Sequence, residues 1–181
     1  MLILWALPLG IAAGLLLGGA TERLSTLRFR WPWLAIAGLL VQVVLFTDAG
    51  FAAVGAAAPA IYVASTAAVL VAVLRNLGLA GMALVALGAA SNLAAILANG
   101  GSMPADPGAL ATAGLDPGSH TNSVVLADPA LRILTDVLAV PAWVPFANVF
   151  SFGDVLIAIG IAIALAWTMR RDPDRARPAS D

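Results

Sequence analysis

Residues 79–104 read LAGMALVALGAASNLAAILANGGSMP, and the fold is decided where this stretch changes character. Residues 79–98 carry no charge and are almost entirely apolar. A helix rises 1.5 Å per residue, so about 20 such residues cross a hydrocarbon core about 30 Å thick. Asn99 and two glycines then end the apolar run. The stretch predicts a membrane-spanning helix that opens directly into a polar segment.

The composition of the whole chain agrees with a membrane location. The 181 residues are 61% hydrophobic and 10% charged, with a mean hydropathy of +0.98. A soluble domain is about 45–50% apolar and about 25% charged, so this chain cannot cover a water-facing surface with polar groups. The net charge of −1 lacks the basic face that nucleic-acid binding needs. The absence of cysteine and lysine excludes disulfides, thiolate chemistry and Schiff bases.

Four further segments have the length and hydropathy of a membrane span, which predicts an all-α bundle of five transmembrane helices. The five spans cover about residues 2–19, 31–47, 57–74, 79–98 and 152–169. Residues 1–171 are expected to form one membrane domain, in which residues 99–151 make an outer cap. Residues 172–181 are polar and contain proline, which predicts a disordered tail.

The arginines predict the orientation. Five spans place eight of the nine arginines on one side, in the 21–30 loop, after the third span and in the tail, and leave only Arg132 on the other. By the positive-inside rule those eight are cytoplasmic, so the N-terminus lies outside and the C-terminus inside. Four tryptophans fall near the predicted interfaces, as an aromatic belt does: Trp31, Trp33, Trp143 and Trp167.

The outer segment divides into a loop and a short helix. Residues 99–127 are rich in Gly, Pro, Ser and Asp, which predicts loop with turns at 99–101 and 116–118. Asp128-Pro129 is typical of a helix start, and leucines then recur at helical spacing until Pro141. A helix over residues 129–140 is too short to span, so it is expected to lie in the outer interface or to be re-entrant.

Two carboxylates at the outer membrane edge are candidate catalytic groups. Asp154 lies close to the hydrocarbon, where an ionisable group indicates function, yet Ser151 three residues earlier gives the spacing of a capping box. Asp136 follows Arg132 by four residues, which predicts either a helical ion pair or a carboxylate that faces the site. His120, the one histidine, is the third candidate, with a solvated loop position as its alternative.

The remaining polar residues predict binding or helix contacts. Gln42 and Asn92 lie within spans, where each either bonds a neighbouring helix or lines a cavity beneath the cap. No metal-ligand spacing or cofactor motif occurs, so neither a metal nor a cofactor is predicted. The candidate binding residues are Asn99, Gly100, Gly101, Met103, Pro104, Asn92, Gln42 and Ser151.

A small-residue stripe in the first span predicts close helix packing. Gly10, Gly14 and Gly18 recur every four residues, so another helix backbone can approach them. The approaching helix is either another span of the same chain or the same span of a second copy.

Three motifs occur in order: Asn99-Gly100-Gly101-Ser102-Met103-Pro104, then Leu134-Thr135-Asp136-Val137, then Phe150-Ser151-Phe152-Gly153-Asp154. They resemble the N-G-G-x-M-P, L-x-D-V and F-S-x-G-D pattern of a family of small bacterial polytopic membrane proteins, a domain of unknown function. The resemblance covers nearly the whole chain. It implies a multi-pass protein of the bacterial inner membrane and no particular activity, and it emphasises Asn99, Asp136 and Asp154.

Residues 151–154, Ser-Phe-Gly-Asp, are also similar to the G-x-G-D of intramembrane aspartyl proteases. In such an enzyme Asp136 would be the second carboxylate, because two carboxylates that share a proton suit peptide hydrolysis. The departures are Ser151 in place of the first glycine and a separation of only 18 residues, with Pro141 and Pro145 between the two aspartates. In those proteases each aspartate lies on its own span.

The leading functional hypothesis is a non-enzymatic membrane component that binds, assists or assembles with a partner or lipid through its outer cap. The alternative is an enzyme or carrier for a lipid or small hydrophobic substrate, with Asp136 and Asp154 as the acid/base pair and Asn99 and His120 as positioning groups. An aspartyl protease and an ion channel are further alternatives. The scarcity of charged residues within the spans argues against ion transport.

Overall fold

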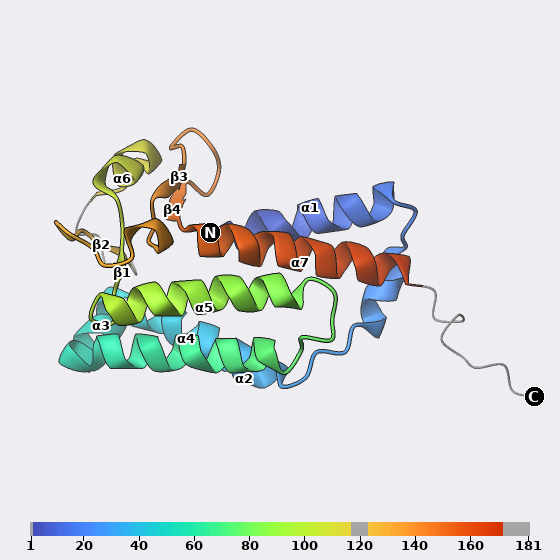
Figure 1. The fold of residues 1–181 in the computed structure, drawn as a ribbon, viewed down its shortest axis with the longest axis horizontal. Helices are drawn as coiled ribbons and strands as arrows, with labels where there is room; N and C mark the ends of the chain where they lie inside the picture. Colours follow the sequence, from blue (N-terminus) through green and yellow to red (C-terminus); the bar gives the residue numbers. More distant parts are fainter. Residues whose placement is uncertain (1, 117–122, 172–181) are drawn as a thin grey trace, which may run out of the picture.

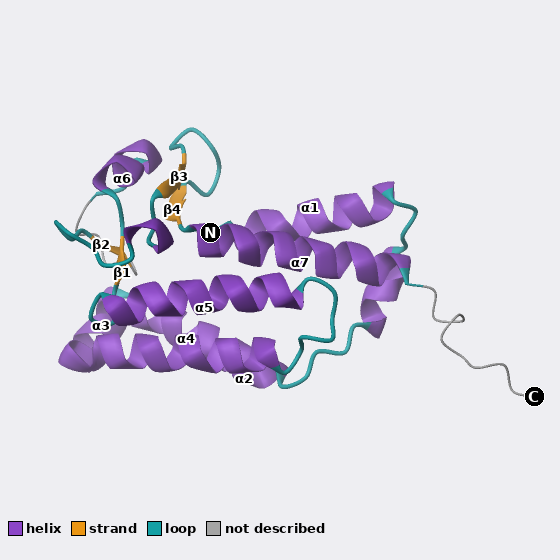
Figure 2. Ribbon diagram, viewed as in Figure 1, coloured by secondary structure: helices purple, strands orange, loops and turns teal. Residues whose placement is uncertain are grey.

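The structure is a computed structural model that describes residues 2–116 and 123–171, and helices make up most of it (Figure 2). The prediction of a mostly helical protein is confirmed. Each long helix lies within a predicted span, except that the last helix extends one residue further. The long helices are α1 (Ile3–Leu16), α2 (Pro32–Leu45), α4 (Ala58–Leu74), α5 (Met82–Ala98) and α7 (Phe152–Arg170).

Among the described residues, two helical stretches have both the length and the hydropathy to cross a bilayer. One is α7, and the other is Asp48–Leu74, in which α3 (Asp48–Val54) and a 3-10 turn (Gly55–Ala57) lead into α4. The helices α1, α2 and α5 are apolar but shorter, with 14, 14 and 17 residues. The helix α1 ends earlier than predicted because Gly18 adopts a φ of 77° and turns the chain.

The long helices form a row whose spatial order differs from their chain order (Figure 1). Helix α1 packs on α7, α7 on α5, α5 on α4, and α4 on α2. Helix α1 therefore has α7 as its main neighbour, and α5 occupies the middle of the row, between α7 and α4.

Glycines bring α1 close to α7. A side chain at Gly10 would lie 2.8 Å from the backbone of Ala162, and one at Gly14 would meet Met169 at 3.0 Å or closer. A side chain at Gly18 would meet nothing within 4 Å. The structure thus places two of the three glycines of the stripe against another helix of the same chain.

A second set of glycines brings α5 close to α7. Gly88 lies against Gly153, and Gly81 lies against Gly160. The two glycine contacts are seven residues apart along each segment, which is about two helical turns. Both contacts therefore lie on the sides of α5 and α7 that face each other. Contact between backbones at two levels explains why these helices approach so closely.

The end of the row opposite the cap is held by polar contacts to backbone. The side-chain amide of Asn76 accepts a hydrogen bond from the Arg30 N–H at 2.7 Å and donates to the Arg30 carbonyl at 2.8 Å. It also donates to the Ala72 carbonyl of its own helix at 2.7 Å, and Asn76 is buried. The guanidinium of Arg23, in the 3-10 helix Thr21–Thr26, donates to the carbonyl of Met169 at 3.3 Å.

The residues between α5 and α7 fold into a small cap at the other end of the row (Figure 1). Strands β1 (Met103–Pro104) and β2 (Ser123–Val124) pair in parallel, whereas β3 (Leu138–Val140) and β4 (Asn148–Phe150) form an antiparallel hairpin. Helix α6 (Pro107–Ala113) packs on the hairpin. The core of the cap consists of Ala105, Ala109, Leu110, Ala113 and Val149.

The helix predicted over residues 129–140 is wrong. Only a 3-10 turn forms at Arg132–Leu134, and the residues after it become β3. Contacts within the cap override the leucine spacing, because Leu131 adopts a φ of 52° and Asp136 pairs with Ala105 as a parallel bridge. The cap therefore has no amphipathic helix at these positions to lie in the interface or to re-enter the membrane.

The loop predicted over residues 99–127 is wrong in one part, because it contains α6. Asp106 caps this helix by accepting hydrogen bonds from the N–H groups of Gly108 and Ala109 at 2.9 and 3.2 Å. The turn at 99–101 is confirmed, since Gly100 and Gly101 have φ values of 71° and 87°. The predicted turn at 116–118 falls largely outside the described residues, and the tail 172–181 falls wholly outside them.

Candidate functional site

Three polar side chains, here named the polar junction, join α5 to the start of α7. The hydroxyl of Ser151 lies 2.8 Å from the amide oxygen of Asn92 and 3.1 Å from a carboxylate oxygen of Asp154, and shares its proton between them. The amide nitrogen of Asn92 donates to the other carboxylate oxygen at 2.8 Å. Ser151 is fully buried, whereas Asn92 and Asp154 are half-buried, so these bonds are partly shielded from water.

The polar junction also caps α7. The Ser151 hydroxyl accepts from the backbone N–H of Asp154, and the Asp154 carboxylate accepts from the backbone N–H of Ser151, both at 3.0 Å. This reciprocal pair is the capping box predicted from the spacing. Both oxygens of the Asp154 carboxylate thus accept hydrogen bonds from protein groups.

Asn99 fixes the root of the cap. Its side-chain nitrogen donates to the carbonyl of Ala95 in α5 at 2.8 Å and to the carbonyl of Ala130 at 2.9 Å. Its oxygen accepts from the Ala130 N–H, also at 2.9 Å. The side chain of Asn99 therefore pairs with the backbone of Ala130 much as a neighbouring strand would. This pairing ties the cap to the end of α5.

The residues after Asn99 are packed against the helices. A side chain at Gly101 would approach Pro59 of α4 within 2.6 Å, so only glycine fits this contact. Met103 and Pro104 follow as β1 and are almost fully buried. The candidate binding residues of this motif therefore form the base on which the cap stands.

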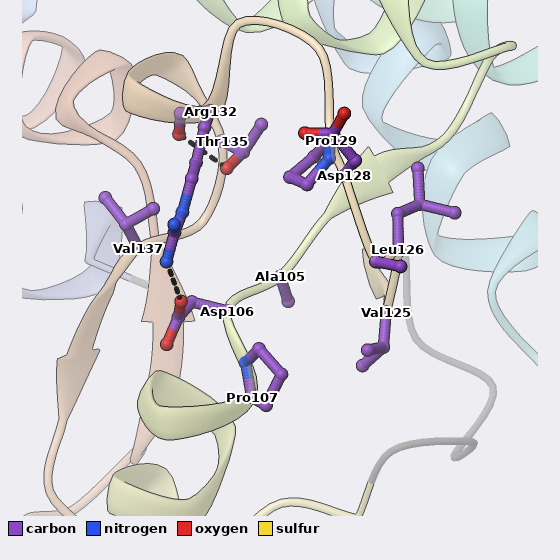
Figure 3. A pocket seen from close by; sticks show the side chains of 11 residues that line it. Ala105, Asp106, Pro107, Val125, Leu126, Asp128, Pro129, Arg132, Thr135 and Val137 are labelled. Atoms are coloured by element: carbon purple, nitrogen blue, oxygen red, sulfur yellow. Dashed lines mark hydrogen bonds and ion pairs between the residues drawn. The ribbon is translucent and has the colours of Figure 1, made fainter.

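Asp136 is buried within the cap, with 3% of its surface exposed. Its backbone N–H donates to the Pro104 carbonyl at 2.9 Å, and its carbonyl accepts from the Asp106 N–H at 3.0 Å. The ion pair predicted between Arg132 and Asp136 required a helix that does not form. Arg132 pairs instead with Asp106 at 3.0 Å, so that prediction is wrong (Figure 3).

A pocket of about 240 Å³ opens beside this ion pair (Figure 3). Asp106 and Arg132 stand on one side of it, and Val125 and Leu126 stand on the other. An ion pair that faces an apolar wall suits a small amphiphilic ligand, whose polar end would meet the charges. The other residues that line the pocket are Ala105, Pro107, Ala127, Asp128, Pro129, Thr135 and Val137.

The charge of Asp106 is stabilised by its neighbours. The hydrogen bond from the Arg132 guanidinium, and then those from the backbone N–H groups of Ala109 and Gly108, lower the pKa of Asp106 below its ordinary value of 3.8. Asp106 is therefore ionised throughout the neutral range. It serves the pocket as half of an ion pair and serves α6 as its N-cap.

The cap is expected to loosen in acid. Because the pKa of Asp106 is lower in the folded than in the unfolded chain, its contribution to stability is complete above about pH 4 and is lost as the pH falls through the folded pKa. Hydrogen–deuterium exchange of the α6 amides, corrected for the intrinsic rate, is expected to accelerate in that range. In Asp106→Asn, which keeps a capping oxygen without the charge, this acceleration should be absent; its persistence would contradict the assignment.

The structure brings together only part of the predicted set. Asn92, Ser151 and Asp154 meet at the polar junction, and the residues after Asn99 form the root of the cap. Gln42 lies apart, between α2 and α4, where its amide donates to the Thr66 hydroxyl at 3.2 Å. This confirms the helix-to-helix alternative for Gln42. His120 lies outside the described residues.

The pocket was not predicted from the sequence. Asp106-Pro107 carries the same helix-start signature as Asp128-Pro129, so α6 and its capping carboxylate were open to prediction. The ion pair was not, because 26 residues separate Asp106 from Arg132 and no local spacing relates them. Within the described part of the chain, no group of acidic or histidine side chains is arranged as a metal site.

Comparison with known proteins identifies the family of the chain. A family model described as "Family of unknown function (DUF5317)" matches residues 26–166. That range contains the cap, the polar junction, all of α2, α4 and α5, and most of α7. No curated protein and no solved structure matches the chain.

Proposed function

The chain belongs to this family of unknown function, and on that premise we propose that it is a multi-pass protein of the bacterial inner membrane whose outward-facing cap binds a small amphiphilic ligand. The pocket beside Asp106 and Arg132 carries the proposal. It lies in a folded cap at one end of a row of apolar helices, where a receptor or accessory subunit would present a binding site. The proposed role is binding and not catalysis.

Apolar side chains exposed along the helices support five spans. Leu9 in α1 is 61% exposed, and Leu40 and Val43 in α2 are 57% and 61% exposed. Side chains of this kind at the two ends of the row need lipid around them. Fourteen residues rise only about 21 Å, so α1 and α2 would cross with local thinning of the bilayer, helped at α2 by the flanking Trp31 and Trp33.

The distribution of charge supports the orientation. Among the described residues, all the arginines except Arg132 lie in segments at the end of the row opposite the cap (Figure 1). The positive-inside rule then places this end in the cytoplasm and the cap outside. The arginines at the inner end are Arg23, Arg28, Arg30, Arg75, Arg170 and Arg171.

The hydrogen bonds favour binding over acid/base catalysis. The Asp154 carboxylate is engaged by Asn92 and by Ser151, which accounts for it as a cap of α7. Arg132, in contrast, is 71% exposed and directs only part of its five N–H donors to Asp106. The pocket therefore offers an accessible cation to the polar end of a ligand.

Single cysteines test both the orientation and the pocket, because the native chain has no cysteine. Ala127→Cys lies at the pocket, Ala111→Cys on an exposed position of α6, and Ser25→Cys at the opposite end of the row. In intact cells a membrane-impermeant maleimide is expected to label the two cap positions, and to label Ser25→Cys only after permeabilisation. A photoreactive group on Ala127→Cys is expected to capture a ligand that the same group on Ala111→Cys does not.

The labelling experiment tests the orientation and the capture experiment tests the pocket, and each can fail independently of the other. Labelling of Ser25→Cys in intact cells would contradict the orientation. Equal capture at Ala127→Cys and Ala111→Cys, or capture at neither, would contradict binding at the pocket while leaving the orientation intact. Arg132→Gln in the Ala127→Cys background should reduce the capture, because it removes the accessible cation.

A further inference from the structure

The loop that joins β3 to β4 presents two aromatic side chains to the outside of the cap. Trp143 is 85% exposed and Phe146 is 63% exposed. Two successive turns shape this loop, residues 141–147, in which the N–H of Val144 bonds the carbonyl of Pro141 at 2.9 Å and the N–H of Ala147 bonds that of Val144 at 3.2 Å. The loop therefore has a defined conformation, and in this conformation both aromatic rings are exposed.

The base of the hairpin is fixed to the rest of the cap. The N–H of Ala142 donates to the Thr112 carbonyl of α6 at 3.0 Å, and Val149 of β4 belongs to the cap core. Phe146 adopts a φ of 63°, a left-handed conformation that is unfavourable for a residue with a side chain. An anchored loop that holds two aromatic rings exposed is typical of an interaction surface.

Charge and position identify what covers the rings. No charged residue occurs between Asp136 and Asp154, so the hairpin offers nothing to a charged protein surface. Only Ser151 separates β4 from α7, and Figure 1 shows the loop at the level of the first turn of α7 along the long axis of the molecule. Phe152, in that first turn, is also 47% exposed. The loop and the exposed Phe152 thus lie at the same level, at the cap end of α7.

We propose that residues 141–147 form a lipid anchor, in which Trp143 and Phe146 insert into the headgroup region of the outer leaflet beside α7. The proposal rests on the membrane orientation proposed above. Trp143 favours this boundary because its apolar ring meets the acyl chains while the indole N–H stays hydrated, and the Phe146 ring adds apolar area beside it. Since the hairpin and α6 are bonded together, the anchor would hold the cap, and hence the pocket, at a fixed height above the bilayer.

Tryptophan fluorescence in vesicles tests the anchor. Replacement of Trp5, Trp31, Trp33 and Trp167 with phenylalanine leaves Trp143 as the sole tryptophan. In phosphatidylcholine vesicles, lipids brominated near the headgroup are expected to quench Trp143 severalfold more than they quench a tryptophan introduced by Ala111→Trp in the same background with Trp143→Phe. A matched variant that keeps only Trp33, at the start of α2, reports on the membrane helices themselves.

The outcomes separate this inference from the proposal on which it rests. If Trp33 is quenched but Trp143 behaves like the tryptophan at position 111, the anchor is overturned and the membrane orientation stands. If Trp33 is not quenched, the membrane proposal itself fails. Shielding of Trp143 from both brominated lipid and aqueous acrylamide would mean that protein covers it, which also overturns the anchor. A nitroxide on Phe146→Cys in the otherwise native chain measures the same depth should the multiple replacement fail to fold.

Discussion

Gly153→Ala is expected to lower the free energy of unfolding by about 2–4 kcal/mol. A side chain at this position would overlap the amide oxygen of Asn92 and lie 2.8 Å from the carbonyl oxygen of Gly88. The added methyl group therefore has to push α5 away from α7 or break the polar junction. Either response costs packing energy, and the second leaves hydrogen-bonding groups of the buried Ser151 and the half-buried Asn92 without partners.

The matched control for this change is Gly78→Ala. Gly78 lies in the turn between α4 and α5, and a side chain there would meet nothing within 4 Å. The thermal midpoint of the detergent-solubilised protein can be measured from the loss of its monodisperse peak in gel filtration. This midpoint should fall for Gly153→Ala and change little for Gly78→Ala. Equal midpoints for the two variants would show that the contact between the glycines of α5 and α7 does not limit stability.

Replacement of Asp154 is expected to separate a capping role from a catalytic one. In Asp154→Ala the helix loses its capping partner, and the amide of Asn92 and the N–H of Ser151 lose an acceptor, which together cost about 2–3 kcal/mol. Asp154→Asn keeps one oxygen for Ser151, and a rotated Asn92 amide can accept from the new NH₂ group. We expect it to cost about 1 kcal/mol or less.

The same two variants are informative about function. If Asp154 acts only as a cap, Asp154→Asn retains ligand capture at the pocket and growth of cells that depend on the protein, while Asp154→Ala loses both in proportion to its lower abundance in the membrane. Loss of function in an Asp154→Asn variant that is as stable and abundant as the native protein would contradict a purely capping role. It would indicate that the function needs the carboxylate of Asp154 itself.

The elements that sequence predicts well are those governed by local chemistry. The hydropathy of residues 79–98 requires a helix, and the spacing of Ser151 and Asp154 defines a capping box whatever else surrounds it. The turn at Gly100 and Gly101 follows from the ability of glycine to adopt positive φ. In each case the residues that determine the structure lie within one or two helical turns of each other.

The elements that it predicts poorly depend on contacts between distant residues. Leucines at helical spacing predicted a helix after Asp128, but the backbone of Ala130 is held by Asn99, and Asp136 pairs with Ala105. Such pairing across about 30 residues outweighs a helix propensity worth at most a few tenths of a kcal/mol per residue. The pocket is missed for the same reason, because its two charged residues come from different parts of the cap.

The packing of α1 against α7 has a consequence for how the protein is made. Ala166, which faces Gly14, follows it by 152 residues, so α1 is synthesised well before the helix against which it packs. Until α7 is made, the glycine face of α1 lacks this partner, and the 3-10 helix that Arg23 bonds to the end of α7 lacks this attachment. A product interrupted before α7 would retain a detached first helix. Because α7 packs on both α1 and α5, the row of helices can close only after α7 has been made.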